Sequence, residues 1–353
     1  MSLTVDIEKN LDNFCLRVAF NAGEGITSLL GASGCGKSMT LKCIAGVATP
    51  DRGRIVLNDR VLFDSEKRIN LPPQKRKVGY LFQNYALFPN MTVYENILCS
   101  VRNAGSSAAR REITENVIKR LHLTSVCNQP ATSVSGGEMQ RTALARILVN
   151  NAEIIMLDEP FSALDEHLRF AVENEVAELM RGYGRTVLLV SHNRDEVYRL
   201  SSRVIVMHKG MKETEGEVGE VFKNPRTVNA ARLTGVKNIV PASLDTGGVL
   251  HVPGWGISVT AGNHLCSGLV TMAGLRMNDI KTERTADVQG RFYDFIISGV
   301  TENLFNYIVE LYRKDLPDGL PLFWQVSKDM WHSDERKEIS LFIPDTAVMP
   351  LCE

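Results

Sequence analysis

The sequence lacks a long hydrophobic run, and it lacks an excess of charge of either sign. Its longest apolar segments, such as residues 187–190, have the length of a strand, whereas a membrane-spanning helix needs about 20 apolar residues. The charged N-terminus has no apolar segment of the kind that a signal peptide contains. The net charge of −1 argues against the basic surface of a nucleic-acid-binding protein. We therefore expect a cytoplasmic protein that meets a membrane only through a partner.

The chain also lacks a C-x-x-C pair. Its seven cysteines are scattered, which favours reduced thiols over a zinc site or a disulfide framework. Hydrophobic sequence is present in ordinary amounts, because 44% of the residues are apolar and 23% are charged, as expected for a protein with a packed core. A length of 353 residues exceeds that of one average domain, so we expect two or three.

A glycine-rich loop at residues 31–38 is the most informative motif of the chain. It follows the G-x-x-x-x-G-K-S pattern between an apolar run and a helix-like stretch. In such a loop, backbone N–H groups at a helix N-terminus point inward and bind phosphate. Lys37 can reach the β- and γ-phosphates, and the Ser38 hydroxyl can bind Mg²⁺. The predicted nucleotide contacts are Gly31, Ala32, Ser33, Gly34, Cys35, Gly36, Lys37, Ser38 and Met39.

Two acidic residues, Asp158 and Glu159, follow the apolar run 154–157. A buried parallel strand there brings the Asp158 carboxylate to the carboxyl edge of a sheet, beside the phosphate loop. We expect Asp158 to hold Mg²⁺, and Glu159 to polarise the water that attacks phosphate. Further upstream, residues 135–137 read Ser-Gly-Gly at a predicted helix start, where unhindered N–H groups offer a second place for an anion.

The organisation of the chain changes near residue 225. Before it, strand-like and helix-like stretches alternate, which predicts a parallel sheet with right-handed crossovers. Asn58-Asp59 also predicts a hairpin turn. After it, short β-rich segments are separated by Gly, Asp and Pro turns, as in a small barrel. The fold class expected is an α/β P-loop domain followed by a small all-β domain.

With these motifs in this order, the chain resembles the ATP-binding subunit of ABC transporters over roughly residues 1–230. The resemblance implies that residues 31–38 are the Walker A loop and that the strand ending at Asp158 is Walker B. Glu159 then matches the catalytic glutamate, and His192 the switch histidine, which senses the γ-phosphate. Gln83 matches the glutamine that senses Mg²⁺ and couples to the membrane subunit. The implied metal ligands are Ser38, Gln83 and Asp158.

The resemblance also implies that two copies sandwich two ATP molecules. Residues 134–138 match the family's signature motif, which in one copy contacts the γ-phosphate of the ATP bound to the other copy. The residues expected to act in trans are Ser135, Gly136, Gly137, Glu138 and Asp165. Val134 and Glu138 stand where the commonest family pattern has Leu and Gln. The segment expected to supply an aromatic for adenine, residues 8–12, has none. Phe14 is the nearest candidate, although its alternation with neighbouring residues also suits a core position.

The C-terminal region resembles the OB-like regulatory domain (TOBE/MOP-type) of importer ATPases. Residues 234–238 are most similar to the molybdate and sulfate/molybdate group, in which this domain can bind oxyanion and damp transport. The resemblance implies an ABC nucleotide-binding domain at 1–230 and the OB-like barrel at 231–353. Lys237, Ser327 and Lys328 are candidate oxyanion donors, and a pure dimerisation module is the alternative.

The function implied is that of an ATPase energising an importer, because exporters usually fuse membrane helices to the ATPase. ATP and Mg²⁺ are the expected cofactors. The expected partners are a second copy, two integral-membrane permease subunits and, indirectly, an extracytoplasmic substrate-binding protein; nucleic acid is not expected. The location implied is peripheral, on the cytoplasmic face of the cell membrane. The segment after Gln83 would dock a permease helix, with Tyr85, Leu87 and Phe88 as anchors or, alternatively, as local core.

The sequence is compatible with several transported substrates. Molybdate or tungstate leads, followed by sulfate, sugars, polyamines and ferric iron, because importer specificity lies in the binding protein and permease. A soluble ABC ATPase without a transporter is less favoured, since such proteins usually carry two cassettes or a coiled-coil insertion, and this chain has one cassette and no sustained heptads.

Overall fold

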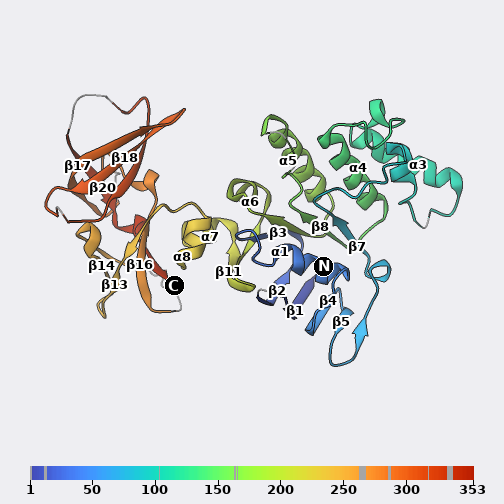
Figure 1. The fold of residues 1–353 in the computed structure, drawn as a ribbon, viewed down its shortest axis with the longest axis horizontal. Helices are drawn as coiled ribbons and strands as arrows, with labels where there is room; N and C mark the ends of the chain where they lie inside the picture. Colours follow the sequence, from blue (N-terminus) through green and yellow to red (C-terminus); the bar gives the residue numbers. More distant parts are fainter. Residues whose placement is uncertain are drawn as a thin grey trace. The chain divides into compact units, whose positions relative to one another are not determined.

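The computed structural model describes residues 2–11, 14–102, 104–162, 164, 166–261, 268–284, 288–316, 318–331 and 337–353 (Figure 1). It divides into two compact units, residues 1–218 and 219–353. The division falls at the first residue of helix α7 (Val218–Lys223). The family-based boundary at residue 230 stays a prediction.

The first unit contains one eleven-stranded sheet with the order β6-β5-β4-β1-β2-β11-β10-β3-β9-β8-β7. Its strands are β1 (Leu3–Asn10), β2 (Cys15–Ala22), β3 (Gly25–Leu30), β4 (Arg52–Leu57), β5 (Arg60–Asp64), β6 (Ile69–Asn70), β7 (Val78–Leu81), β8 (Ile154–Asp158), β9 (Thr186–Ser191), β10 (Arg203–His208) and β11 (Met211–Glu217). Strands β10, β3, β9, β8 and β7 are parallel, while β1, β2, β4, β5 and β6 form an antiparallel extension.

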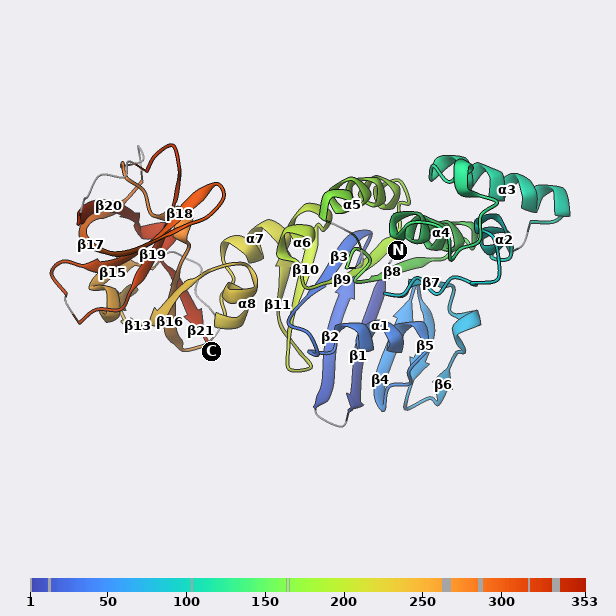
Figure 2. The same cartoon turned by 45° about the horizontal axis from the view of Figure 1, so that its top comes forward.

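The central parallel strands are buried on both faces, which explains their continuous apolar sequences. Ile155 and Leu157 of β8 join one hydrophobic cluster, whereas Ile154 and Met156 join the other. Helix α1 (Lys37–Ala45) belongs to the second cluster, and helices α4 (Gly136–Val149) and α5 (Glu166–Arg181) belong to the first. Figure 2 shows α4 and α5 along one side of these strands. Helices thus cover both faces, as the predicted α/β class requires.

Three further helices complete the first unit. They are α2 (Val93–Leu98), α3 (Ser107–Arg120) and α6 (Arg194–Leu200). Helices α2, α3 and α4 pack on one another as a helical group. The α2 start carries a capping box, in which the Thr92 side chain accepts from the Glu95 amide and Glu95 accepts from the Thr92 amide. None of the described helices is long and apolar enough to cross a membrane.

The second unit is β-rich, which confirms the predicted change of fold class. Its sheets are β12-β16-β21, β13-β14-β15 and β19-β18-β17-β20. Their bounds are β12 (Asn238–Pro241), β13 (Ser243–Leu244), β14 (Val249–Val252), β15 (Ile257–Thr260), β16 (Val270–Leu275), β17 (Gly290–Glu302), β18 (Asn306–Arg313), β19 (Leu322–Ser327), β20 (Glu338–Pro344) and β21 (Met349–Cys352), with helix α8 (Val228–Leu233) before them. The four-stranded sheet curls around a core that contains Trp255, Phe295 and Trp324 (Figure 1).

The cysteines follow the prediction in part. Free thiols are found at Cys15, Cys35, Cys43, Cys99 and Cys127. Cys352 is disulfide-bonded, so the expectation of reduced thiols is wrong at that position. Scattered spacing in a sequence does not report which cysteine side chains the fold brings together, so sequence reasoning missed this disulfide.

Candidate functional site

The glycine-rich loop connects β3 to α1 and is closed tightly against β10. A Cβ atom at Gly31 would lie 2.5 Å from the Met207 carbonyl oxygen, so only glycine fits there. Gly36 caps α1 with φ 105° and without a side-chain hydrogen bond. The first N–H groups of α1 therefore lack a capping side chain from that residue and can bind an anion.

The Lys37 side chain is buried inside this loop. Its ammonium donates to the carbonyl oxygens of Gly31 at 2.7 Å and Ala32 at 2.9 Å. It forms no ion pair with any carboxylate in the described part of the chain. Burial raises the pKa of the neighbouring Cys35 thiol despite the Lys37 charge, so Cys35 is a neutral filler. The loop thus holds one uncompensated positive charge at the place where phosphate would bind.

Asp158 is buried at the carboxyl end of β8 and is held from two sides. Ser38 Oγ donates to its Oδ1 at 2.7 Å, and the Tyr80 hydroxyl donates to its Oδ2 at 2.8 Å. Burial and the Asp158 charge raise the pKa of Tyr80, so Tyr80 remains protonated and acts as the donor. Sequence reasoning missed Tyr80; its only signal was its place on the strand that leads to Gln83.

Glu159 and His192 meet where the neighbouring strands β8 and β9 end. The Glu159 amide donates to the Val190 carbonyl at 3.0 Å, and Glu159 Oε1 lies 3.2 Å from His192 Nδ1. Glu159 has φ 47°, a left-handed conformation that is uncommon for residues other than glycine and that is concentrated at functional sites. The parallel pairing of the two strands accounts for this meeting of residues far apart in the sequence.

A cavity of about 450 Å³ joins the predicted contacts from several elements. Its lining consists of Leu11, Phe14, Ser33, Gly34, Gly36, Lys37, Ser38, Met39, Lys42, Gln83 and Glu159. Phe14 is half-buried, lines this cavity and packs against the core as well, and its contact with adenine stays a prediction. Leu11 and Lys42 were not predicted as site residues; nearness to Phe14 and to the loop was their only signal.

The donors present fit a magnesium ion. The hydroxyl of Ser38 and the carboxylate of Asp158 lie together, and the Gln83 amide faces the same cavity. These are the oxygen ligands that Mg²⁺ prefers. No group of three His, Cys, Asp or Glu side chains in the described residues is arranged to hold a metal alone. This donor set suits an ion that arrives with phosphate oxygens and water.

Comparison with known proteins identifies the family. Residues 15–162 match the family described as ABC transporter. The spermidine/putrescine import ATP-binding protein PotA of Vibrio cholerae is 31% identical over 351 residues, which cover 91% of this chain and 90% of that protein. The chain belongs to the ABC transporter family. It is an ATP-binding subunit of the importer type.

Other relatives agree on the family and differ in cargo. The molybdenum import ATP-binding protein ModC of Rhodospirillum rubrum is 38% identical over 224 residues, 63% of this chain and 60% of that protein. PotA of Bacillus cereus is 40% identical over 227 residues, 64% of this chain and 67% of that protein. Among solved structures, CbiO1 from Clostridium perfringens, part of the ABC transporter complex CbiONQ, has a TM-score of 0.55 and 26% identity over 62% of this chain and 90% of that one.

A second solved structure is a dimeric ATP-binding cassette in a post-hydrolysis state with ADP and Pi bound. It has a TM-score of 0.53 and 27% identity, covering 62% of this chain and 99% of that one. The predicted ABC signature of this chain lies at the start of α4, where Ser135 and Glu138 form a capping box. Hydrogen bonds from the Ser135 hydroxyl and amide lower the pKa of Glu138, which explains how a glutamate is accommodated at this position.

None of the signature residues lines the Lys37 cavity of the same chain. This absence concerns Ser135, Gly136, Gly137 and Glu138, all of which the structure describes. Asp165, the remaining residue predicted to act in trans, lies outside the described residues. The action of these residues in trans stays a prediction.

Proposed function

We propose that this importer subunit hydrolyses ATP in the Lys37 cavity and thereby energises uptake of an oxyanion, with molybdate or tungstate as the first candidates. The observation that carries the hydrolytic part is the pair Glu159 and His192, 3.2 Å apart, of which Glu159 lines the cavity that Lys37 and Ser38 also line. A base, a γ-phosphate sensor and a phosphate-binding cation are thus present together.

The proposed chemistry assigns a separate task to each side chain. Lys37 exchanges its two loop carbonyls for β- and γ-phosphate oxygens. Glu159 accepts a hydrogen bond from the attacking water and takes its proton as the bond between the γ-phosphorus and the bridging oxygen breaks. His192 supports the developing charge on the γ-phosphate. Mg²⁺, held by Ser38, Gln83 and Asp158, would supply neutralisation of phosphate charge.

Adenine would lie against Phe14 and Leu11. Both residues line the cavity, and Phe14 is the aromatic residue in its described lining. A half-buried phenyl ring is suited to stacking on a base. Phe14 therefore stands in for the aromatic that the family places earlier in the sequence.

We further propose that two copies close on two ATP molecules, with Ser135, Gly136 and Gly137 of each copy facing the nucleotide of the other. Support comes from the exposed position of Ser135 at the N-terminus of α4, away from its own cavity. The glycines leave N–H groups free of side-chain crowding. The dimeric cassette with ADP and Pi provides a precedent for such an assembly.

A second cavity, of about 430 Å³, is proposed to receive a helix of a permease subunit at the membrane surface. It is lined by residues of β7, of the segment after Gln83 and of α4, among them Tyr85, Phe88 and Met91. Phe88 is 44% exposed, and the Arg146 guanidinium lies 4.6 Å from the centre of its ring. Tyr85 is buried instead. Phe88 is therefore the aromatic anchor that we assign to the interface.

The oxyanion proposal rests on a cavity of about 390 Å³ in the second unit. Among the described residues, Lys223, Arg276 and Lys281 line it together with one acid, Asp279. The predicted donor Lys328 pairs with Glu302 instead, and neither Lys237 nor Ser327 lines this cavity. An excess of cationic donors suits a small dianion. Polyamine import is the second candidate, because PotA of Vibrio cholerae matches nearly the whole chain.

Glu159→Gln tests the hydrolytic function. The variant keeps the Mg²⁺ and phosphate contacts but lacks the base, so we expect it to bind ATP and to form a stable dimer with Mg-ATP while turnover falls by about 100-fold or more. Size-exclusion chromatography and phosphate release are the measurements. Hydrolysis at the wild-type rate would assign the base to another residue.

A further inference from the structure

A buried carboxylate supports the turn that carries His192. Glu196, on α6, is 5% exposed, and its Oε2 accepts a hydrogen bond from the Ser191 hydroxyl at 3.0 Å. Ser191 Oγ in turn accepts from the Asn193 amide at 2.9 Å. Ser191 Oγ thus links Ser191 and Asn193, the two residues on either side of His192, to Glu196.

Glu196 also shares a small cavity with the proposed base. The cavity measures about 70 Å³ and is lined by Glu159, Phe161, Ser162, Arg169, Ser191, His192, Asn193 and Glu196. This is room for about one or two water molecules, and Phe161 is the apolar residue in its described lining. The other Glu196 oxygen, Oε1, is buried without a hydrogen-bond partner. A buried acid with one unsatisfied oxygen is costly and calls for an explanation.

We propose that Glu196 is a positioning residue for ATP hydrolysis, which through Ser191 fixes the turn 191–193 and so holds His192 at Glu159. The proposal rests on the hydrolytic function proposed above. Glu196 does not line the phosphate cavity, so its proposed action on hydrolysis runs through the turn. The ionised carboxylate is the effective form, because a charged acceptor binds the Ser191 hydroxyl more strongly than a neutral one does.

The charged groups around Glu196 come from three places. On α5, Glu173 and Arg169 face it, and on its own helix α6, Arg199 forms an ion pair with Glu173. Glu159 and His192 face it across the small cavity. Strand β3, which also packs against α6, contributes no titratable side chain.

These surroundings give Glu196 a titration near neutral pH. Burial raises the pKa of Glu196 to about 7; the Ser191 hydrogen bond opposes the rise, the Glu173 carboxylate adds to it, and Arg169 and Arg199 oppose it. Glu196 is therefore ionised above this pH and protonated below it. The turn is held most firmly on the alkaline side, so kcat is expected to rise with pH through about 7.

Glu196→Gln keeps the shape of the side chain and removes its charge. In the full chain we expect kcat on the alkaline side of neutrality to fall on the order of tenfold, as for a slightly misplaced group. We also expect the rise of kcat through pH 7 to disappear and KM for ATP to stay unchanged. Ser191→Ala should produce a similar loss, and the double variant should lose no more than either single one, since both act through one hydrogen bond.

Glu173→Gln is the matched control. It removes a like charge beside Glu196 and leaves the Ser191 hydrogen bond in place, so the rise in kcat should move to lower pH while the alkaline rate is kept. Thermal unfolding of each variant checks the fold. If Glu159→Gln is inactive but Glu196→Gln keeps the wild-type pH profile and rate, the positioning role is wrong and the proposed function stands. If Glu159→Gln is fully active, both fail.

Discussion

The two units of the chain bury different kinds of side chain. In residues 1–218, charged groups that include Lys37, Asp158, Glu173 and Glu196 lie in the interior and bond to the groups around them. Among the described residues of 219–353, the buried polar side chains are Thr234 and Asn238, and Asn238 fastens β19 through two bonds with the Phe323 backbone.

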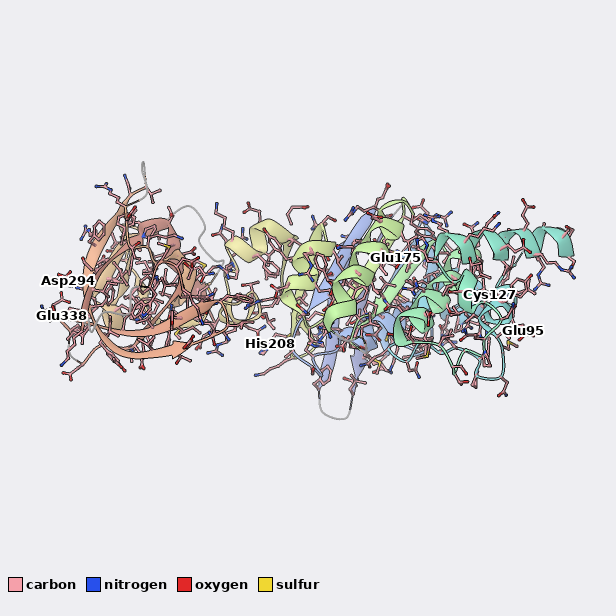
Figure 3. All side chains as sticks on the ribbon, turned by 90° about the horizontal axis from the view of Figure 1, so that it is seen from above. Glu95, Cys127, Glu175, His208, Asp294 and Glu338 are labelled. Atoms are coloured by element: carbon pink, nitrogen blue, oxygen red, sulfur yellow. The ribbon has the colours of Figure 1, made fainter. Side chains whose placement is uncertain are left out.

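Several charges of the second unit are instead paired at the surface. Asp294 and Glu338 point outward from the four-stranded sheet (Figure 3), and Glu338 forms an ion pair with Lys314. Exposed pairs of this kind contribute about 0–1 kcal/mol. Burying a charge costs far more unless it is satisfied. The first unit thus keeps costly buried charges where the proposed chemistry needs them, whereas none of the described charged side chains of the second unit is buried.

The largest effect is expected when one lysine of each unit is replaced, the buried Lys37 and the exposed Lys314. Lys37→Ala removes the buried cation of the phosphate loop, and we expect kcat for ATP to fall by about 100-fold or more, as when a catalytic donor is lost. Lys314→Ala removes an exposed cation of the second unit and should leave kcat unchanged. Steady-state phosphate release on both variants is the measurement. Equal effects would show that burial of the lysine does not distinguish the two units.

A smaller effect is expected from the apolar core of the second unit. Trp324 is 3% exposed, and its indole N–H donates to the Ile280 carbonyl at 3.1 Å. Trp324→Ala should cost about 3–5 kcal/mol of unfolding free energy in that unit, because it leaves a cavity. ATP binding should persist, since the cassette motifs all lie in residues 1–218. Calorimetric unfolding with and without nucleotide measures both, and loss of ATP binding would show that the first unit depends on the second.

The smallest effect concerns the cations of the second unit that line the 390 Å³ cavity. Titration calorimetry of the full chain should give weak heats with molybdate and tungstate and less with sulfate. Lys281→Ala should reduce them, because the exposed Lys281 ammonium is one of three cationic donors there. Lys314→Ala is the control. No heat from any oxyanion at about millimolar concentration, a range typical of weak sites, would leave this unit as a dimerisation module.

Several features were predictable because neighbouring residues determine them. The Asn58-Asp59 turn predicted from sequence is present between β4 and β5, with φ 47° and 65°. The glycine-rich loop lies between a strand and a helix, as its pattern requires. The apolar runs 154–157 and 187–190, predicted as strands, lie in strands β8 and β9 of the parallel part of the sheet.

The sequence by itself determined the family, the phosphate loop and the order of the motifs, because each depends on contiguous residues whose chemistry is local. Only the tertiary structure decided that Tyr80 donates to Asp158, that Phe14 serves both core and cavity, and that Glu196 supports Ser191. These contacts join residues from different elements, and single side chains without a motif carry no sequence signal for them. Sheet order and burial create them. Strand pairing brings distant residues within hydrogen-bond reach, and exclusion of water strengthens each bond and makes an unpaired polar group costly.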